Sequence, residues 1–355
     1  MLEKFIDMKD NTNRILYIDS IKGVMILFVM YYHVLWTCVK FKTSPTVEVF
    51  DLVCMQTFFF VSGFVSYKKN DIFQLKDFLI ILRKRIRTIL LPTILMFVFF
   101  TLYFNLDFLS SFYNEFKNGY WFTYVLFVIY TLHFSLLLFY KKINFQIRIF
   151  DLLLFLLGGA MYLLYSRVYK YVDFDFCHYV SLKFVMKYYF FFVAGYMLKK
   201  YYLYLEKYIF NDKILALVLF VAFIPFVSDN KKGPFCIIEL AVSLSQVLLV
   251  YVFFMKNSFF SSENATNRHL ALFGRHSMEI YFIHYFFLFS MPYALDFILH
   301  CQAICLKGQP GFYFIPEIFC ILPIALSLAY LSIGVRFIIN LSPTISRLFF
   351  GAIPK

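Results

Sequence analysis

The stretch RILYIDSIKGVMILFVMYYHVLW, residues 14–36, decides the class of this protein. It is long and apolar enough to cross a bilayer, which takes about 20 residues, yet it carries Asp19, Lys22 and His33. Ionisable side chains inside a membrane-spanning helix are costly and usually functional. At about 3.6 residues per turn, Lys22 and His33 fall about 20° from the same line, and Asp19 lies within about 60° of both. The three side chains therefore form one polar stripe.

This stripe runs deep into the membrane. Each helical residue rises about 1.5 Å, so Asp19 and His33 are separated by about 21 Å along the axis. The carboxylate would lie near one membrane surface and the imidazole well inside, which predicts a cavity lined by this helix. A simpler interpretation stays open for each residue. Asp19 can cap the helix, Lys22 can extend its charge to the surface, and His33 can be a buried side chain hydrogen-bonded to its neighbours.

The composition places the whole chain in the membrane. Of 355 residues, 62% are hydrophobic, 15% are charged and 51 are Phe, which excludes a water-soluble fold with a polar exterior. Clusters of Lys, Arg, Asn, Pro and Gly separate the apolar runs. Ten membrane-spanning helices are expected, near residues 21–39, 47–66, 89–105, 120–140, 150–166, 184–200, 213–229, 235–255, 277–299 and 314–336. The sequence thus predicts an all-α polytopic fold in which residues 1–355 form one transmembrane domain.

Basic residues predict the orientation. With ten spans, the N-terminal segment, the segment from Lys68 to Arg87 and the loop around Lys141 lie on the same side of the membrane. The positive-inside rule makes this side the cytoplasm and places both termini there. This bias, together with attraction to anionic lipid headgroups, explains the net charge of +13 without a nucleic-acid partner.

The sequence offers no pattern typical of a metal site. Its seven cysteines form neither a CxxC motif nor a Cys/His ligand spacing, and most of them lie in or beside apolar runs, where cysteine behaves as a small hydrophobic residue. We therefore expect no metal and no permanently bound cofactor.

Four separated segments carry a resemblance to a known family. They are the opening pattern of Arg14, Asp19, Lys22-Gly23 and His33, then MQTFFFVSGFVSYKK at 55–69, RKRIRTILLP at 83–92 and GRHSMEIYFIHYFFL at 274–288. In this order they resemble the integral-membrane acyltransferase-3 family, whose members include sugar O-acetyltransferases of bacterial surface polysaccharides. The segments GYWFTYVLF at 119–127 and FFFVAGYMLKK at 190–200 fit as well, so the likeness extends over most of the chain.

Two departures limit what is carried over. Family members often have His-Met-Pro before the aromatic run of the second span, where this chain has Cys54, Met55 and Gln56. Many also have Arg-x-x-Arg at the third span, where Arg85 is here followed by Thr88. No histidine is therefore assigned at the first position, and which basic residue acts at the second stays open.

The resemblance implies an integral-membrane O-acyltransferase of the bacterial cell (inner) membrane. Such an enzyme moves an acyl group, most simply acetyl, from cytoplasmic acyl-CoA to a hydroxyl of a surface polysaccharide or a lipid-linked saccharide. An imidazole, with an ordinary pKa of about 6.5, suits the general base, and we expect His33 and Asp19 to be catalytic. Basic side chains at the inner mouth would bind the donor phosphates: Arg14, Lys22, Arg83, Lys84, Arg85 and Arg87. Positive-inside bias explains the same charges without a ligand.

Further polar residues are expected on the acceptor side. Ser277, Tyr281 and His284 share one face of the predicted ninth span, and we expect Tyr281 and His284 to bind the acceptor. Hydrogen bonding between helices is the alternative interpretation. Glu239, in the eighth span, is also expected to bind the acceptor and needs a partner, for which Lys22 and His284 are candidates.

Three other features have simpler interpretations. Arg275 and Glu279, four residues apart, are expected to pair. Glu317 is expected near a membrane surface in the tenth span. The loop at 167–183 mixes charged and aromatic residues that can contact sugar rings, although an ordinary solvated loop explains it as well.

The alternative function is an exporter or flippase of a lipid-linked saccharide, in which His33 would line a permeation path. Transporters of this kind often contain inverted repeats and paired helices broken by Gly or Pro. The sequence has neither pattern, which favours the enzyme.

Overall fold

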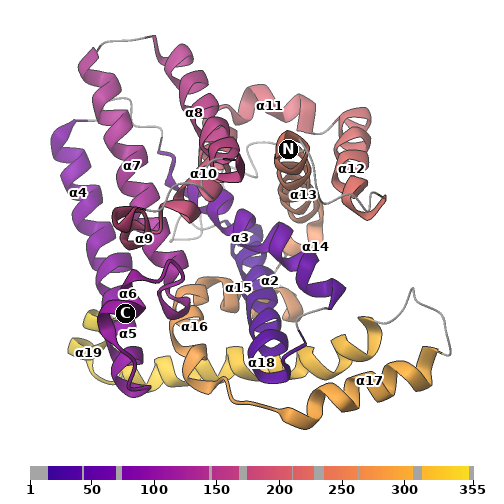
Figure 1. The fold of residues 1–355 in the computed structure, drawn as a ribbon. Coiled ribbons are helices and arrows are strands. Elements are labelled where there is room, and N and C mark those ends of the chain that lie inside the picture. Colours follow the sequence, from indigo (N-terminus) through magenta and orange to yellow (C-terminus); the bar gives the residue numbers. More distant parts are fainter. Residues whose placement is uncertain are drawn as a thin grey trace. The chain divides into compact units, whose positions relative to one another are not determined.

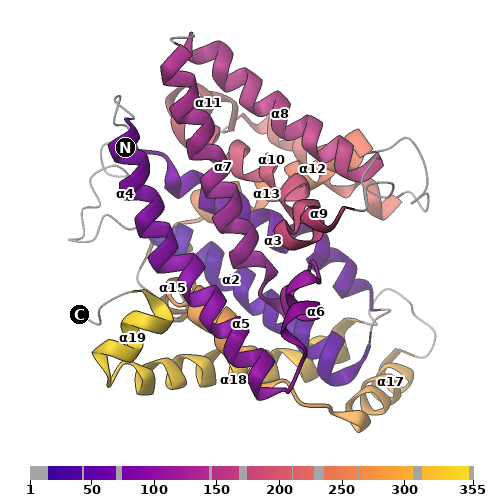
Figure 2. The same ribbon diagram turned by 60° about the vertical axis from the view of Figure 1, so that its left-hand side comes forward.

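The computed structural model describes residues 15–41, 44–68, 74–143, 146–167, 174–209, 211–227, 236–262, 264–306 and 314–351. Their regular secondary structure is entirely helical. The helices form two compact units (Figures 1 and 2), of which unit 1 comprises residues 1–58 and 246–336, and unit 2 comprises residues 59–245 and 337–355.

Unit 1 contains the N-terminal polar helix and most of the C-terminal third of the chain. Its elements are α2 (Leu16–His33), the π-helix η1 (Val34–Val39), the first part of α3 (Pro45–Ser66), the end of α13 (Cys236–Lys256), α14 (Ser258–Ser261), α15 (Ala265–Arg275), α16 (Ser277–Ile283), the 3₁₀ turn η5 (His284–Phe287), α17 (Pro292–Leu306) and most of α18 (Phe314–Ile339).

Unit 2 contains the middle of the chain, together with the remaining parts of α3, α13 and α18. Its other elements are α4 (Leu75–Arg85), the π-helix η2 (Ile86–Leu90), α5 (Leu91–Tyr103), α6 (Phe108–Tyr113), η3 (Lys117–Gly119), α7 (Trp121–Ile143), α8 (Ile147–Arg167), α9 (Asp175–Val180), α10 (Leu182–Lys200), α11 (Tyr202–Ile209), α12 (Asp212–Val227) and α19 (Pro343–Phe350).

Several helices are long and apolar enough to cross a membrane. Among the described residues there are six: Leu16–Val39, Leu75–Tyr103, Trp121–Tyr140, Ile147–Ser166, Ile237–Lys256 and Ile315–Ile339. Val53–Ser66 is a shorter apolar helix. The prediction of an all-helical, multi-pass membrane protein is confirmed, whereas the count of ten spans and the cytoplasmic position of both termini stay predictions.

The prediction of one continuous helix over residues 277–299 is wrong. The chain is helical through Ile283, forms a 3₁₀ turn from His284 to Phe287 and becomes helical again only at Pro292. Proline lacks a backbone N–H and disfavours helical geometry in the residue before it, which here is Met291. The backbone N–H of Met291 donates instead to the carbonyl oxygen of Cys38, 2.8 Å away.

Reciprocal pairs of glycines bring helices into backbone contact within each unit. In unit 1, a Cβ atom on Gly23 would overlap the carbonyl oxygen of Leu270, and one on Gly274 would overlap that of Asp19. The helices α2 and α15 therefore cross at a distance that only glycine permits. Near the crossing, the hydroxyl of Ser20 donates to Oδ1 of Asn267, 2.5 Å away.

A second pair joins α3 and α10 in unit 2. A Cβ atom on Gly63 would overlap the carbonyl oxygen of Phe192, and one on Gly195 would overlap that of Phe60. Both glycines belong to segments that carry the family resemblance, so these segments are explained by packing and not by chemistry.

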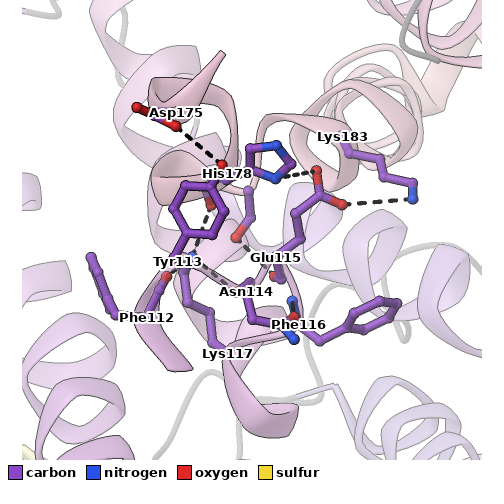
Figure 3. Close-up of polar contacts among 10 residues, drawn as sticks. Phe112, Tyr113, Asn114, Glu115, Phe116, Lys117, Asp175, His178 and Lys183 are labelled. Carbon is purple, nitrogen blue, oxygen red and sulfur yellow. Dashed lines mark hydrogen bonds and ion pairs between the residues drawn. The ribbon is translucent and has the colours of Figure 1, made fainter. Parts of the chain in front are cut away.

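A polar network fixes the connection between α5 and α7 against α9 and α10 (Figure 3). Lys117 is buried, and its ammonium donates to the carbonyl oxygens of Phe112, Asn114 and His178 at 2.6, 3.2 and 2.9 Å. Glu115 lies 3.5 Å from Nδ1 of His178 and 3.6 Å from Nζ of Lys183.

The backbone of this connection is unusual. Lys117, Asn118 and Gly119 have φ values of 48°, 50° and 100° in succession, and for the two non-glycine residues this left-handed geometry is strained. The carbonyl contacts of the Lys117 ammonium hold the turn in place. Burial lowers the pKa of Lys117 to about 8.

Alanine at the glycine contacts should destabilise the protein. We expect Gly23→Ala and Gly195→Ala each to lower the free energy of unfolding by at least about 3 kcal/mol, because backbone atoms cannot yield to the added methyl group. Gly334→Ala is the matched control, since nothing lies within 4 Å of its Cβ position. Thermal unfolding of the detergent-purified protein measures this, and a wild-type Tm for Gly195→Ala would contradict the close crossing.

The Lys117 network should make stability rise with pH above neutrality. Between the folded pKa of about 8 and the ordinary value of 10.5, the unfolded chain holds a proton that the folded protein has released. Stability therefore increases as pH rises through this window, while below about pH 8 the full cost of burying the charge is present. The Tm of wild type relative to Lys117→Met should increase from pH 7.5 to 10.

Subtracting the variant removes the contribution of every other titrating group. Lys213→Met, which replaces an exposed lysine of α12, should give a pH-independent difference. A flat difference for Lys117→Met as well would show that Lys117 does not titrate in this range.

Candidate active site

His33 lies where α2 ends and the π-helix η1 begins. Such departures from α-helical geometry are frequent at functional sites. Its Nε2 is 3.1 Å from the hydroxyl of Tyr285, which is hydrogen-bond distance. Its ring centroid lies 5.1 Å from that of His284 and 5.0 Å from that of Tyr285. Two residues of the α16–η5 segment thus meet the end of α2 within unit 1.

His284 is fully buried and has one ring nitrogen to spare. Its Nδ1 lies 3.1 Å from the carbonyl oxygen of Ile280, so Nδ1 carries the proton in the neutral ring and donates it to this acceptor. The Nε2 atom is buried and has no hydrogen-bond partner among the described residues. It therefore bears a lone pair that can accept a proton or a hydrogen bond, and a buried polar atom without a partner calls for an explanation such as a ligand or a water molecule.

Tyr281 completes this group. Its ring centroid is 6.0 Å from those of His284 and Tyr285, and its side chain hydrogen-bonds Tyr285. We call His33, Tyr281, His284 and Tyr285 the two-histidine cluster. The structure thus brings together three of the residues predicted from the sequence and adds Tyr285. The signal for Tyr285 was its spacing of four residues from Tyr281.

Asp19 and Lys22 form a separate pair on the first turns of α2. Nζ of Lys22 lies 3.7 Å from Oδ1 of Asp19, and the Lys22 side chain is 26% exposed. The helix begins at Leu16 after Ile15, so Asp19 is not its cap. Because Asp19 and His33 are about 21 Å apart along a helix, the carboxylate does not touch the imidazole. The predicted catalytic role of Asp19 stays a prediction, without direct contact to His33.

The basic run lies inside a long helix of unit 2 and does not precede it. Arg83, Lys84 and Arg87 are exposed, whereas the guanidinium of Arg85 lies 3.9 Å from the centroid of the Tyr130 ring. This cation–π contact holds Arg85 in place, which leaves the other three available to an anion. Arg83 also lines a shallow surface groove together with Lys76, Leu75, Leu79 and Ile80. Arg14 lies outside the described residues.

Glu239 is exposed on α13, and its negative charge acts on Tyr165 of α8. Its expected partnership with Lys22 or His284, and its role in acceptor binding, stay predictions.

The predicted pair of Arg275 and Glu279 is wrong. Nε of Arg275 donates to the carbonyl oxygen of Ala271, and Glu279 pairs with Nε of Arg336 at 3.0 Å and with Nδ1 of His276 at 3.5 Å. The rule for residues four apart requires one continuous helix. Here α15 ends at Arg275 and α16 begins at Ser277, so the two side chains belong to different helices.

The described residues include no group of three or more His, Cys, Asp or Glu side chains that could hold a metal ion. The chemistry available to the two-histidine cluster is therefore that of two imidazoles and two phenols. Imidazoles transfer protons near neutral pH, and phenolic hydroxyls donate hydrogen bonds.

Comparison with known proteins identifies the family. A family model described as an acyltransferase domain, of the acyltransferase-3 type, matches residues 15–334. Neither the curated proteins nor the solved structures contain a match. The matched region includes the two-histidine cluster, the Asp19–Lys22 pair and the basic run. The chain is a multi-pass membrane protein that belongs to the acyltransferase-3 family.

Proposed function

We propose that the protein transfers an acyl group, most simply acetyl, from acyl-CoA to a hydroxyl of a polysaccharide or a lipid-linked saccharide in the bacterial inner membrane. The observation that carries the proposal is the two-histidine cluster, in which a hydroxyl group already lies 3.1 Å from Nε2 of His33. A general base must come within about 2.6–3.2 Å of the proton it removes. The Tyr285 hydroxyl thus occupies the kind of position that an acceptor hydroxyl requires.

In the proposed reaction His33 removes the proton of the acceptor hydroxyl while the oxygen forms a bond to the thioester carbonyl carbon. The C–S bond then breaks, and the thiolate of CoA leaves with the proton that the imidazole had accepted. His284 has a lone pair on Nε2 that can orient the acceptor hydroxyl. The hydroxyls of Tyr281 and Tyr285 are suited to donate hydrogen bonds to the negative oxygen of the tetrahedral intermediate.

The donor requires cations for its phosphates. The exposed Arg83, Lys84 and Arg87 suit this role, because arginine binds phosphate in a bidentate manner. Lys22 is a further cation, although it is already paired with Asp19. We propose that these side chains hold the nucleotide end of acyl-CoA and that Tyr281, His284 and Glu239 contact the acceptor.

Removal of the base should abolish transfer. We expect His33→Ala to lower the rate of acyl transfer at least about 100-fold, the usual contribution of a general base. Purified protein in proteoliposomes is supplied with labelled acetyl-CoA and glycan extracted from the producing cells, and mass spectrometry measures the acyl increment. His269→Ala is the control, because this histidine is exposed and hydrogen-bonded only to Tyr330 among the described contacts.

Two results would overturn the function. One is unchanged acylation by His33→Ala. The other is movement of unmodified saccharide across the vesicle membrane without consumption of the thioester, which would favour a flippase.

The basic run should act on donor binding alone. We expect Arg83→Ala and Arg87→Ala each to raise the KM for acetyl-CoA at least about tenfold, equivalent to about 1.4 kcal/mol of binding, with little change in kcat. Arg148→Ala, at an exposed arginine of α8, should leave KM unchanged.

A truncated donor sharpens this test. S-acetylpantetheine carries the same thioester but none of the nucleotide phosphates, so its KM should be the same in wild type and in Arg83→Ala. Equal sensitivity of both donors, or no sensitivity of either, would assign these arginines to membrane orientation and not to the donor.

A further inference from the structure

Glu317 has a buried carboxylate surrounded by hydroxyl groups. It lies in the first turn of α18, and the residue is 1% exposed. The hydroxyl of Tyr31 donates to its Oε1 at 2.8 Å, and that of Ser44 donates to its Oε2 at 2.6 Å. The hydroxyl of Thr46 also donates to Oε1. The sequence placed Glu317 near a membrane surface, but it gave no sign that the side chain is enclosed.

Three different parts of unit 1 meet at this carboxylate. Tyr31 belongs to the last turn of α2, whereas Ser44 and Thr46 stand at the start of α3. The Ser44 hydroxyl in turn accepts from the backbone N–H of Thr46 at 3.2 Å. Removing a carboxylate from water is expensive unless hydrogen bonds replace the lost hydration, and hydrogen bonds to an ionised oxygen are the stronger kind. The contacts therefore tie α2, α3 and α18 together at one point.

A second tie holds the chain on the other side of His33. The carbonyl oxygen of Cys38 in η1 accepts the backbone N–H of Met291 at 2.8 Å. His33 thus lies between Tyr31, held by Glu317, and Cys38, held by the segment that follows η5. Between these two points the chain changes from α-helical to π-helical geometry, which leaves the direction of the His33 ring sensitive to both ties.

We infer that Glu317 is a positioning residue for His33, acting through its hydrogen bond to Tyr31 at the end of α2. The inference rests on the proposed function, in which His33 is the base. Glu317 does not touch the reacting atoms. It fixes the height and rotation of the last turn of α2, so that Nε2 of His33 stays within reach of a hydroxyl. A displacement of about 1 Å at a reacting group can reduce a rate about 100-fold.

The test compares Glu317→Gln, Tyr31→Phe and the double variant, measured per amount of folded protein. We expect Glu317→Gln to lower kcat between about tenfold and 100-fold while KM for acetyl-CoA stays within about twofold of wild type. The double variant should match Glu317→Gln and not the product of the two single effects, because both changes remove one interaction. Ser327→Ala is the matched control on the same helix, at an exposed side chain, and should keep the wild-type kcat.

A purely structural role predicts a different result. In that case Glu317→Gln would lower Tm and the yield of folded protein but leave kcat per folded molecule at the wild-type value. Multiplicative effects of the two single changes on kcat would likewise overturn the inference, since Tyr31 would then not mediate the action of Glu317.

A second readout does not depend on turnover. Diethyl pyrocarbonate modifies unprotonated imidazole nitrogens, and peptide mapping reports the rate of modification at His33 alone. We expect this rate to increase at least about threefold in Glu317→Gln, because the Tyr285 hydroxyl no longer covers Nε2, and to remain unchanged in Ser327→Ala. If wild type fails to transfer acyl groups, the proposed function fails, whereas an unchanged modification rate at His33 in Glu317→Gln would overturn the positioning role itself.

Discussion

The backbones of α2 and α15 meet at Gly23 and Gly274, and the arrangement of unit 1 depends on this contact. In lipid there is no hydrophobic force to drive one apolar helix against another, so close packing and hydrogen bonds must hold them. The glycines permit the close approach, and Ser20 and Asn267 add a buried hydrogen bond beside it. Because α15 leads directly into α16, the same crossing also helps to fix the segment that carries Tyr281 and His284.

The two-histidine cluster is less settled than its surroundings. The last turns of α2 pass into a π-helix, the α16 helix tightens into a 3₁₀ turn, and Nε2 of His284 is buried without a partner among the described residues. An unsatisfied buried polar atom costs about 1–3 kcal/mol. Deviations of this kind are expected where a protein gives up local stability for a reactive geometry. The contacts that offset them lie nearby, at Glu317 and at the bond between Cys38 and Met291.

The sequence predicted the class of the fold and the centre of the site better than the connections between helices. Hydrophobic length and composition suffice to predict helices in a membrane, and one polar stripe identifies His33. The meeting of His33 with Tyr281 and His284 agrees with the predicted roles but followed from family motifs and not from distances. The burial of Glu317 could not be derived, because its partners Tyr31, Ser44 and Thr46 are about 270 to 290 residues away along the chain. The pairing of Arg275 with Glu279 failed for a local reason, since the spacing rule assumes a helix that in fact ends between them.

The interruption between His284 and Pro292 has an electrostatic consequence. A helix that stops exposes unpaired carbonyl groups at its C-terminal end, which act as a partial negative charge of about half a unit. Here the α16–η5 segment ends beside the two imidazoles, and α2 changes geometry there as well. Each time a ring nitrogen accepts a proton, these carbonyl dipoles favour the resulting cation. The broken helix thus supplies, without any acidic side chain, a counter-field for the imidazolium.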